Sequence, residues 1–236
     1  MLKIGLVGQK GGSGKTVVCQ ILINAILAKS DASSVLLIDS DPQGSSASYR
    51  QAVVARFPDL ETRFQCAVCT SEEQFAQTLS DAENIGFDYV IIDSAGSHVE
   101  LSKSILAGSD KVLVPFRPVL KEFQSQMATV ELYEEVKKAL NEGGFDAPAF
   151  RLMLNNWSSN DRMTVEQKNV FEIIKESNYL ADFFVPRRNY FETLDQGYLI
   201  VKELETVEVK SNPLLRKNRL EDLEISKQIL TSVEEI

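Results

Sequence analysis

The stretch Gly8-Gln9-Lys10-Gly11-Gly12-Ser13-Gly14-Lys15-Thr16 decides the fold of this chain, and it directly follows the short apolar run 4–7. The apolar run predicts a buried strand. The glycines let the backbone turn tightly, so that successive N–H groups can point inward at an anion. The apolar segment 17–27 then begins a helix whose N-terminus faces the same anion. A strand, a glycine-rich turn and a helix in this order predict a phosphate-binding loop rather than a chance turn.

Two lysines and a threonine give this loop its chemistry. Lys15 can reach the β- and γ-phosphates of a nucleotide, and the Thr16 hydroxyl can bind Mg²⁺. The common spacing G-x-x-x-x-G-K-[ST] has glycine where this chain has Gln9. The chain has Lys10 in addition, a second cation that a nucleotide pocket within one subunit does not need.

Residues 10–16, K-G-G-S-G-K-T, resemble the deviant Walker A motif of the ParA/MinD family of ATPases. The resemblance implies that ATP is bound by the loop residues Gly11, Gly12, Ser13, Gly14, Lys15 and Thr16. It also implies a homodimer that forms on ATP binding, in which Lys10 reaches the phosphates of the other subunit. Hydrolysis is then expected to require the dimer, because no obvious arginine finger is visible in the sequence.

Apolar, β-branched runs alternate with helical patterns along the chain, which is typical of a parallel sheet covered by helices on both faces. We therefore expect an α/β fold of the P-loop NTPase type, and a length of 236 residues suits a single domain over 1–236. The expected strands are Lys3–Val7, Val35–Ile38, Thr62–Val68, Tyr89–Ile92, Lys111–Pro115, Phe150–Asn155 and Phe183–Val185. The expected helices are Lys15–Lys29, Ser45–Phe57, Ser71–Asn84, Val99–Ala107, Phe123–Glu142, Thr164–Glu176 and Pro213–Val233.

Carboxylates follow two of the expected strands, where ligands bind in such sheets. The segment 39–44, D-S-D-P-Q-G, resembles switch I of ParA proteins, which implies that Asp41 orients the attacking water and that Asp39 supports the Mg²⁺ shell near Thr16. Helix capping is the alternative role for two acids before a Pro-Gln turn. Asp93 closes the apolar run 87–92 as in a Walker B motif, where it would contact Mg²⁺ or one of its waters. The segment 94–97 resembles switch II, in which the Gly96 N–H can approach the γ-phosphate.

Two further positions match the family's adenine pocket. Asn155 follows the apolar run 150–154, and Pro186 lies in a segment, 186–197, that resembles the "PRN…E…G" segment of ParA proteins. By that resemblance both flank the base. For Asn155 and the two residues after it, an ordinary turn is the alternative.

Composition limits the cellular setting and the chemistry. No long apolar run predicts a transmembrane helix and no signal-peptide pattern opens the chain, so a cytoplasmic location is expected. Cys66 and Cys69 form a C-x-x-C, but a zinc site needs further ligands, and only Cys19 and His98 remain. We expect Cys66 in a strand and Cys69 in the turn after it, as structural thiols; redox or metal chemistry is the alternative.

The net charge of −9 argues against a protein coated for nucleic acid. Segment 187–219 nevertheless holds seven basic and five acidic residues, a local charge of +2. Either this segment is a solvated helix face, or it forms a positive patch for DNA. In ParA proteins the DNA-contacting residues lie in this region, which makes the following candidates for DNA contact: Arg187, Arg188, Arg216, Lys217 and Arg219. We expect the last helix to pack on the body through Leu220, Leu223, Ser226 with Lys227, and Leu230.

The chain resembles a small, single-domain ParA, and it is also similar to the ParA-like ATPases of conjugative Vir systems. We expect an ATP-switched dimer that hydrolyses ATP slowly with Mg²⁺, binds DNA nonspecifically on the nucleoid, and partitions plasmid, chromosomal or mobile-element DNA. A ParB-like or other protein would stimulate it. The alternatives are a positioning ATPase for a protein cargo or for the conjugation or division machinery, and an electron-transferring iron–sulfur ATPase, which Cys66 and Cys69 fit poorly.

Overall fold

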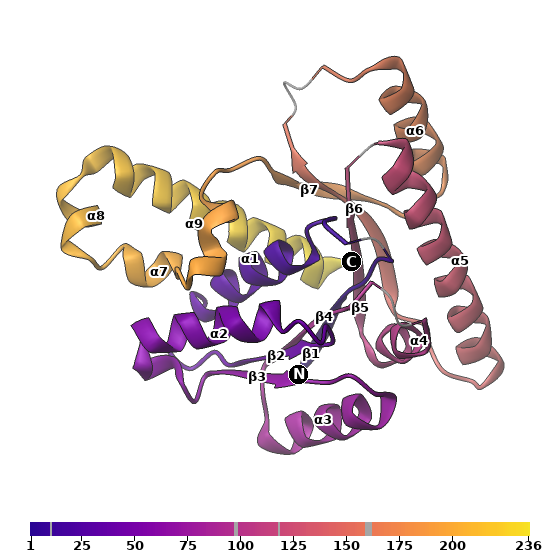
Figure 1. Cartoon of the computed structure of the whole chain (residues 1–236), viewed down its shortest axis with the longest axis horizontal. Helices are drawn as coiled ribbons and strands as arrows, with labels where there is room; N and C mark the ends of the chain where they lie inside the picture. Colours follow the sequence, from indigo (N-terminus) through magenta and orange to yellow (C-terminus); the bar gives the residue numbers. More distant parts are fainter. Residues whose placement is uncertain (10, 97–98, 118, 159–161) are drawn as a thin grey trace.

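A seven-stranded sheet in which every pairing is parallel forms the centre of the computed structural model, which describes residues 1–9, 11–96, 99–117, 119–158 and 162–236 (Figure 1). The order across the sheet is β3-β2-β4-β1-β5-β6-β7. The strands are β1 (Leu2–Leu6), β2 (Val35–Asp39), β3 (Phe64–Val68), β4 (Tyr89–Asp93), β5 (Lys111–Phe116), β6 (Ala149–Trp157) and β7 (Leu180–Pro186).

Helices cover both faces of this sheet (Figure 1). They are α1 (Lys15–Leu27), α2 (Ser45–Arg56), α3 (Glu72–Ile85), α4 (Val99–Gly108), α5 (Leu120–Glu142), α6 (Val165–Glu176), α7 (Ile200–Glu203), α8 (Val207–Ser211) and α9 (Pro213–Glu235). Two short 3₁₀ segments, η1 (Pro58–Leu60) and η2 (Phe191–Gln196), complete the described elements. The predicted α/β class and all the predicted strands and helices are confirmed, with ends that differ by at most three residues; η1, η2, α7 and α8 were not predicted.

The apolar core forms two layers, one on each face of the sheet. In β2, Val35 and Leu37 belong to the core layer that includes residues of α1, α2 and α9, whereas Leu36 and Ile38 belong to the layer that includes residues of α3, α4, α5 and α6. Successive side chains of a strand point to opposite faces, so a strand covered on both faces is apolar throughout. This explains why β2 reads as a continuous apolar run.

The last helix, α9, packs against the body through a stripe that differs in part from the predicted one. Leu223, Ser226 and Leu230 are buried as predicted, but Leu220 is 48% exposed and Asp222 is buried in its place. The expectation for Leu220 was therefore wrong, because the helix turns this position toward solvent. At its far end Glu234 accepts hydrogen bonds from Lys29 and from the Tyr89 hydroxyl.

The topology places a ligand site at the carboxyl end of β1. In the sheet, β2, β3 and β4 lie on one side of β1, and β5, β6 and β7 lie on the other. In such sheets ligands bind at the carboxyl ends of the strands where the direction of winding reverses. Separately, none of the helices in the described ranges combines the length and apolar content needed to cross a bilayer.

Candidate nucleotide site

The glycine-rich loop joins β1 to α1. Gly14 caps α1 in the left-handed region, at φ 94°, and no side chain caps the first turn of the helix. A Cβ at this position would lie 1.9 Å from Asn155 Nδ2, so glycine is required both for its conformation and for its space. Gly11 and Gly12 are exposed. The uncapped N–H groups at the start of α1 therefore meet an open loop, which is a site for an anion.

Lys15 lies beneath this loop. Its Nζ donates a hydrogen bond to the Gly8 carbonyl over 2.9 Å, and the residue is only 8% exposed. Burial lowers the pKa of Lys15 below its ordinary value, and the negative charge of Asp93 opposes that effect. A buried ammonium is stabilised by an anion, so Lys15 fits the predicted contact with phosphate. Lys10, the predicted trans cation, lies outside the described residues.

Asp93 gathers two hydroxyl groups at the end of β4. Thr16 Oγ1 and Ser46 Oγ donate to the same oxygen, Oδ2, over 2.6 and 2.7 Å. Burial raises the pKa of Asp93, and these two hydrogen bonds oppose the rise. The predicted Mg²⁺ residues Thr16 and Asp93 are therefore adjacent. Ser46 was not predicted; it follows the D-S-D-P-Q-G segment closely, and that position is its only sequence signal.

Asp39 and Asp41, which look alike in sequence, have different surroundings. Asp39 is fully buried, and its carboxylate accepts hydrogen bonds from the backbone N–H groups of Asp41, Ser46 and Ala47 over 2.9–3.0 Å. It therefore caps α2, the role that the sequence left as an alternative, and Mg²⁺ support by Asp39 stays a prediction. Asp41 is half-buried, and its Oδ1 accepts the Gln43 N–H over 2.9 Å.

The segment after β4 packs directly on the glycine-rich loop. Ala95 N donates to Ser40 Oγ over 2.7 Å, which links the ends of β4 and β2. A Cβ on Gly96 would lie 2.5 Å from the Gln9 carbonyl oxygen, so only glycine fits here. Two buried hydroxyl oxygens in this region, Ser13 Oγ and Ser94 Oγ, make no hydrogen bond within the described residues. A phosphate group would satisfy such donors, so the residues present fit a nucleotide.

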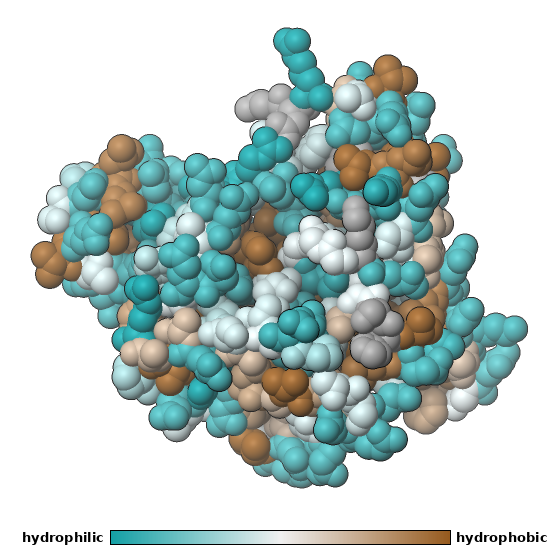
Figure 2. All heavy atoms as spheres, viewed as in Figure 1, coloured by the Kyte–Doolittle hydropathy of each residue, from teal (hydrophilic) through white to brown (hydrophobic). Residues whose placement is uncertain are grey.

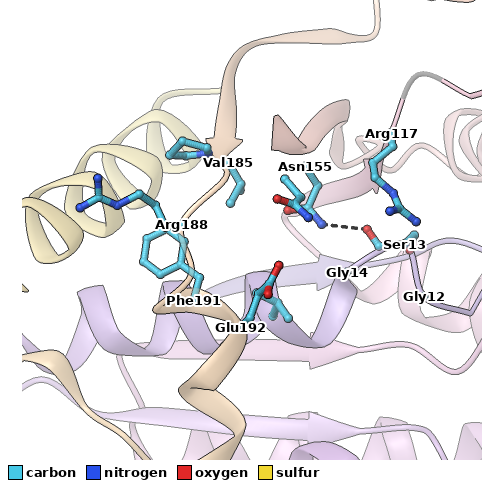
Figure 3. Close-up of a pocket in the computed structure, with 12 residues that line it drawn as sticks. Gly12, Ser13, Gly14, Arg117, Asn155, Val185, Arg188, Phe191 and Glu192 are labelled. Carbon is cyan, nitrogen blue, oxygen red and sulfur yellow. Dashed lines mark hydrogen bonds between the residues drawn. The ribbon is translucent and has the colours of Figure 1, made fainter. Parts of the chain in front are cut away.

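A pocket of about 170 Å³ opens beside the loop (Figure 3). Both residues predicted for the base line it: Asn155 Nδ2 donates to the Ser13 carbonyl over 2.9 Å, and Pro186 ends β7 on the opposite wall. Phe191 and Val185 add apolar surface. An apolar slot that continues from a phosphate loop suits the base and sugar of a nucleotide, although base contacts by Asn155 and Pro186 stay predictions.

The comparisons with known proteins agree with this geometry. A family model described as "VirC1 protein" matches residues 1–236. The chain belongs to the VirC1 family. Two proteins named "Protein virC1", from Rhizobium rhizogenes and Rhizobium radiobacter, are 32% and 31% identical to it over 108 residues. Each match spans 45% of this chain and 45% of the relative, less than half of either protein.

Solved structures of low sequence identity share the fold of this VirC1-family chain. A substituted form of Cyanothece McdA in complex with ATP is 19% identical with a TM-score of 0.63, covering 95% of this chain and 96% of that one. Aquifex aeolicus MinD, a cell division protein, is 16% identical with a TM-score of 0.63, covering 98% of both. The pNOB8 ParA bound to nonspecific DNA is 22% identical with a TM-score of 0.53, covering 75% of both. The fold is thus that of the ParA/MinD-like ATPases.

The five basic residues predicted to contact DNA do not share one environment in the VirC1-family structure. Arg188 Nε donates to the buried Asp222 over 2.7 Å. Arg219 donates to Glu203 over 2.9 Å and stacks on the Tyr190 ring, 3.5 Å from its centroid. Both guanidinium groups are therefore engaged within the protein. The other three, Arg187, Arg216 and Lys217, are exposed.

The cysteines have the predicted placement, Cys66 in β3 and Cys69 just after it. Burial raises the pKa of the Cys66 thiol to about 12, so it is a poor nucleophile. The described residues contain no group of three or more His, Cys, Asp or Glu side chains that could hold a metal ion. His98 lies outside the described residues.

Proposed function

We propose that this VirC1-family chain is a slow, Mg²⁺-dependent ATPase that works as a dimeric switch. In its ATP-bound form it binds nonspecific DNA, for partition or transfer of a plasmid, chromosome or mobile element. The observation that carries the proposal is the cluster at the end of β1, where an open glycine-rich loop, the buried Lys15 and the Thr16–Asp93 pair meet. Phosphoryl transfer needs positioning and charge stabilisation more than covalent chemistry, and these groups supply both.

Each group has a distinct proposed role. The loop N–H groups and Lys15 hold the phosphates, and Thr16 with Asp93 would hold Mg²⁺, which neutralises phosphate charge. Asp41 orients the attacking water. Lys10 reaches the phosphates of a second copy, so hydrolysis depends on pairing. A ParB-like or other protein would stimulate the reaction, and a nucleoid location would follow from DNA binding.

The DNA part of the proposal draws support from two observations. One protein of this fold, the pNOB8 ParA, is described as bound to nonspecific DNA. Arg216 and Lys217 are exposed near the start of α9, which supports a role for them in contacts with phosphates. One subunit offers few such contacts on an acidic body, so pairing of two subunits would raise the affinity.

A second candidate is a positioning ATPase that binds a protein surface instead of DNA. It is favoured by apolar side chains around the same basic residues: Val207 is 82% exposed, Leu214 68% and Leu220 48%. Figure 2 shows apolar surface over the region of α8 and the start of α9, at the left of the view. A phosphate backbone gains nothing from such a surface, whereas a protein partner would bury it.

Two lysine variants test the nucleotide switch. Lys15→Ala is expected to abolish tight ATP binding, because it removes the buried cation of the loop, and calorimetry measures this. Lys10→Ala is expected to bind ATP with nearly unchanged affinity but not to hydrolyse it, because its target lies in the other subunit. Phosphate release and light scattering with ATP measure turnover and pairing. Unchanged affinity in Lys15→Ala, or normal turnover in Lys10→Ala, would contradict the assigned roles.

A further inference from the structure

The side chain of Arg117 reaches the glycine-rich loop from outside the motifs already described. Arg117 directly follows β5, the neighbour of β1, and lines the same pocket as Gly12, Ser13 and Gly14. Figure 3 shows its guanidinium extending from the end of β5 toward Ser13. No sequence motif includes this residue, and an arginine after a strand is usually an ordinary surface residue. The sequence therefore offers no reason to select it.

A buried carboxylate fixes the orientation of this guanidinium. Arg117 Nε and Nη2 donate to Glu122 Oε1 over 3.2 and 3.0 Å, and the Arg117 backbone N–H donates to Glu122 Oε2 over 2.7 Å. The Glu122 side chain is 1% exposed, whereas that of Arg117 is 51% exposed. One end of the ion pair is therefore held inside the protein and the other is presented to the pocket.

The pair is better explained by positioning than by stability. Burying the Glu122 carboxylate costs free energy, and because Arg117 is half exposed, solvent screens the attraction between the two charges, so the ion pair adds little to stability. A guanidinium has five N–H donors, and two of them bond Glu122. The others make no hydrogen bond within the described residues, and they face a loop whose Ser13 hydroxyl is also unpaired.

We propose that Arg117 binds the β-phosphate of a nucleotide held by the same subunit, and that Glu122 is its positioning residue. The proposal rests on the nucleotide site described above. Arginine and phosphate form charge-assisted, two-pronged hydrogen bonds, and the loop N–H groups near Ser13 are those that cradle the α- and β-phosphates in such loops. The subunit that holds the nucleotide thus also supplies an arginine for its phosphates, and no sequence motif indicates this residue.

The test compares nucleotide affinities by calorimetry, with AMP measured by competition. Arg117→Ala is expected to raise the Kd for ADP and for ATP about tenfold or more, and to leave the Kd for AMP within about twofold. Arg117→Lys keeps the charge but loses the planar guanidinium that Glu122 holds. Its Kd for ADP should therefore lie between those of the wild type and of Arg117→Ala. Glu122→Gln should weaken ADP binding because it releases the guanidinium. The control Lys121→Ala removes one exposed charge from the same turn of α5 and should match the wild type.

Each other outcome has a definite meaning. Unchanged ADP affinity in Arg117→Ala overturns the contact. Equal loss for ADP, ATP and AMP shows a collapsed pocket and also overturns it, and thermal unfolding without nucleotide checks for such damage. Loss for ATP alone places the guanidinium away from the β-phosphate and overturns the assignment. A wild-type protein that binds no ATP refutes the proposed function itself, whereas normal wild-type binding with a silent Arg117→Ala refutes only this inference.

Discussion

At the scale of single residues, three aspartates that end or follow apolar strands differ in what reaches their oxygens. Asp39 receives three backbone N–H groups, Asp93 receives two hydroxyl groups, and Asp41 receives the N–H of Gln43. The sequence places all three at the same edge of the sheet, but not the donors, because these come from segments folded onto them. The differences predict which aspartate serves the fold and which serves the chemistry.

Asp39→Ala and Asp41→Ala are expected to separate these roles. Asp39→Ala removes the cap of α2 and leaves three backbone N–H groups without their acceptor, so the free energy of unfolding should fall by about 2 kcal/mol. Asp41→Ala removes one hydrogen bond at a half-buried position and should cost less than about 1 kcal/mol. Asp41→Ala should nevertheless bind ATP, pair and stall without hydrolysis. Urea unfolding and phosphate release measure the two effects; equal destabilisation, or turnover in Asp41→Ala, would contradict the division.

At the scale of elements, the strands and long helices could be predicted because their patterns are local. Apolar runs bounded by turn residues mark β1 to β7, and helical periodicity marks the helices that cover them. The segments η1, η2, α7 and α8 span three to six residues each. Elements this short carry at most two helical turns of pattern, so nothing in the sequence distinguishes them from loops.

Only those site residues that belong to sequence motifs could be predicted. The loop residues, Thr16 and Asp93 are adjacent as expected, since a motif fixes them in one short segment or at one strand end. The pairing of Arg188 with Asp222 was not visible, because the two lie 34 positions apart on different elements. Counting charges in segment 187–219 therefore overestimated how many of them face outward. Arg117 and Glu122 were missed for a different reason: they lie only five positions apart, but only the fold shows that their pair faces the loop.

The buried Asp222 of α9 ties that helix to the segment that lines the nucleotide pocket. It accepts hydrogen bonds from Arg188, at the pocket wall, and from Arg219 of its own helix over 3.4 Å. Asp222→Ala would remove the buried anion that both cations share and leave only Glu203 for Arg219 and Glu221 for Arg188, so we expect a loss of about 1–3 kcal/mol in the free energy of unfolding. We also expect faster amide hydrogen exchange in α9. The control Glu224→Ala changes an exposed acid of the same helix and should have little effect; equal effects would contradict a special role for Asp222.

At the scale of the whole molecule, the two faces of the sheet differ in what they can contact. The nucleotide loop, the pocket wall and α9 share the face that carries α1 and α2, whereas α5 and α6 cover the other (Figure 1). The exposed cations Arg216 and Lys217 lie on the same side as the nucleotide pocket, linked to it through Asp222 and Arg188. A DNA surface on α9 could therefore respond to nucleotide, while one on α5 or α6 would lie across the sheet.

Reversing the charges on α9 tests this surface against an equal change on the other face. Arg216→Glu with Lys217→Glu should weaken binding to all DNA sequences alike, because phosphate contacts carry no sequence information. The slope of log affinity against log salt should fall by about one unit for each lost contact. The matched control is Lys138→Glu with Lys175→Glu, two exposed lysines of α5 and α6, which alters net charge by the same amount. Gel shifts at several salt concentrations, with and without ATP, measure DNA binding by both double variants, and light scattering confirms that pairing is intact.

If the control weakens binding as much as the α9 variant, the effect is one of net charge and not of a surface. If wild-type binding is independent of ATP or the salt slope is unaltered, the apolar and basic face of α8 and α9 is better assigned to a protein partner.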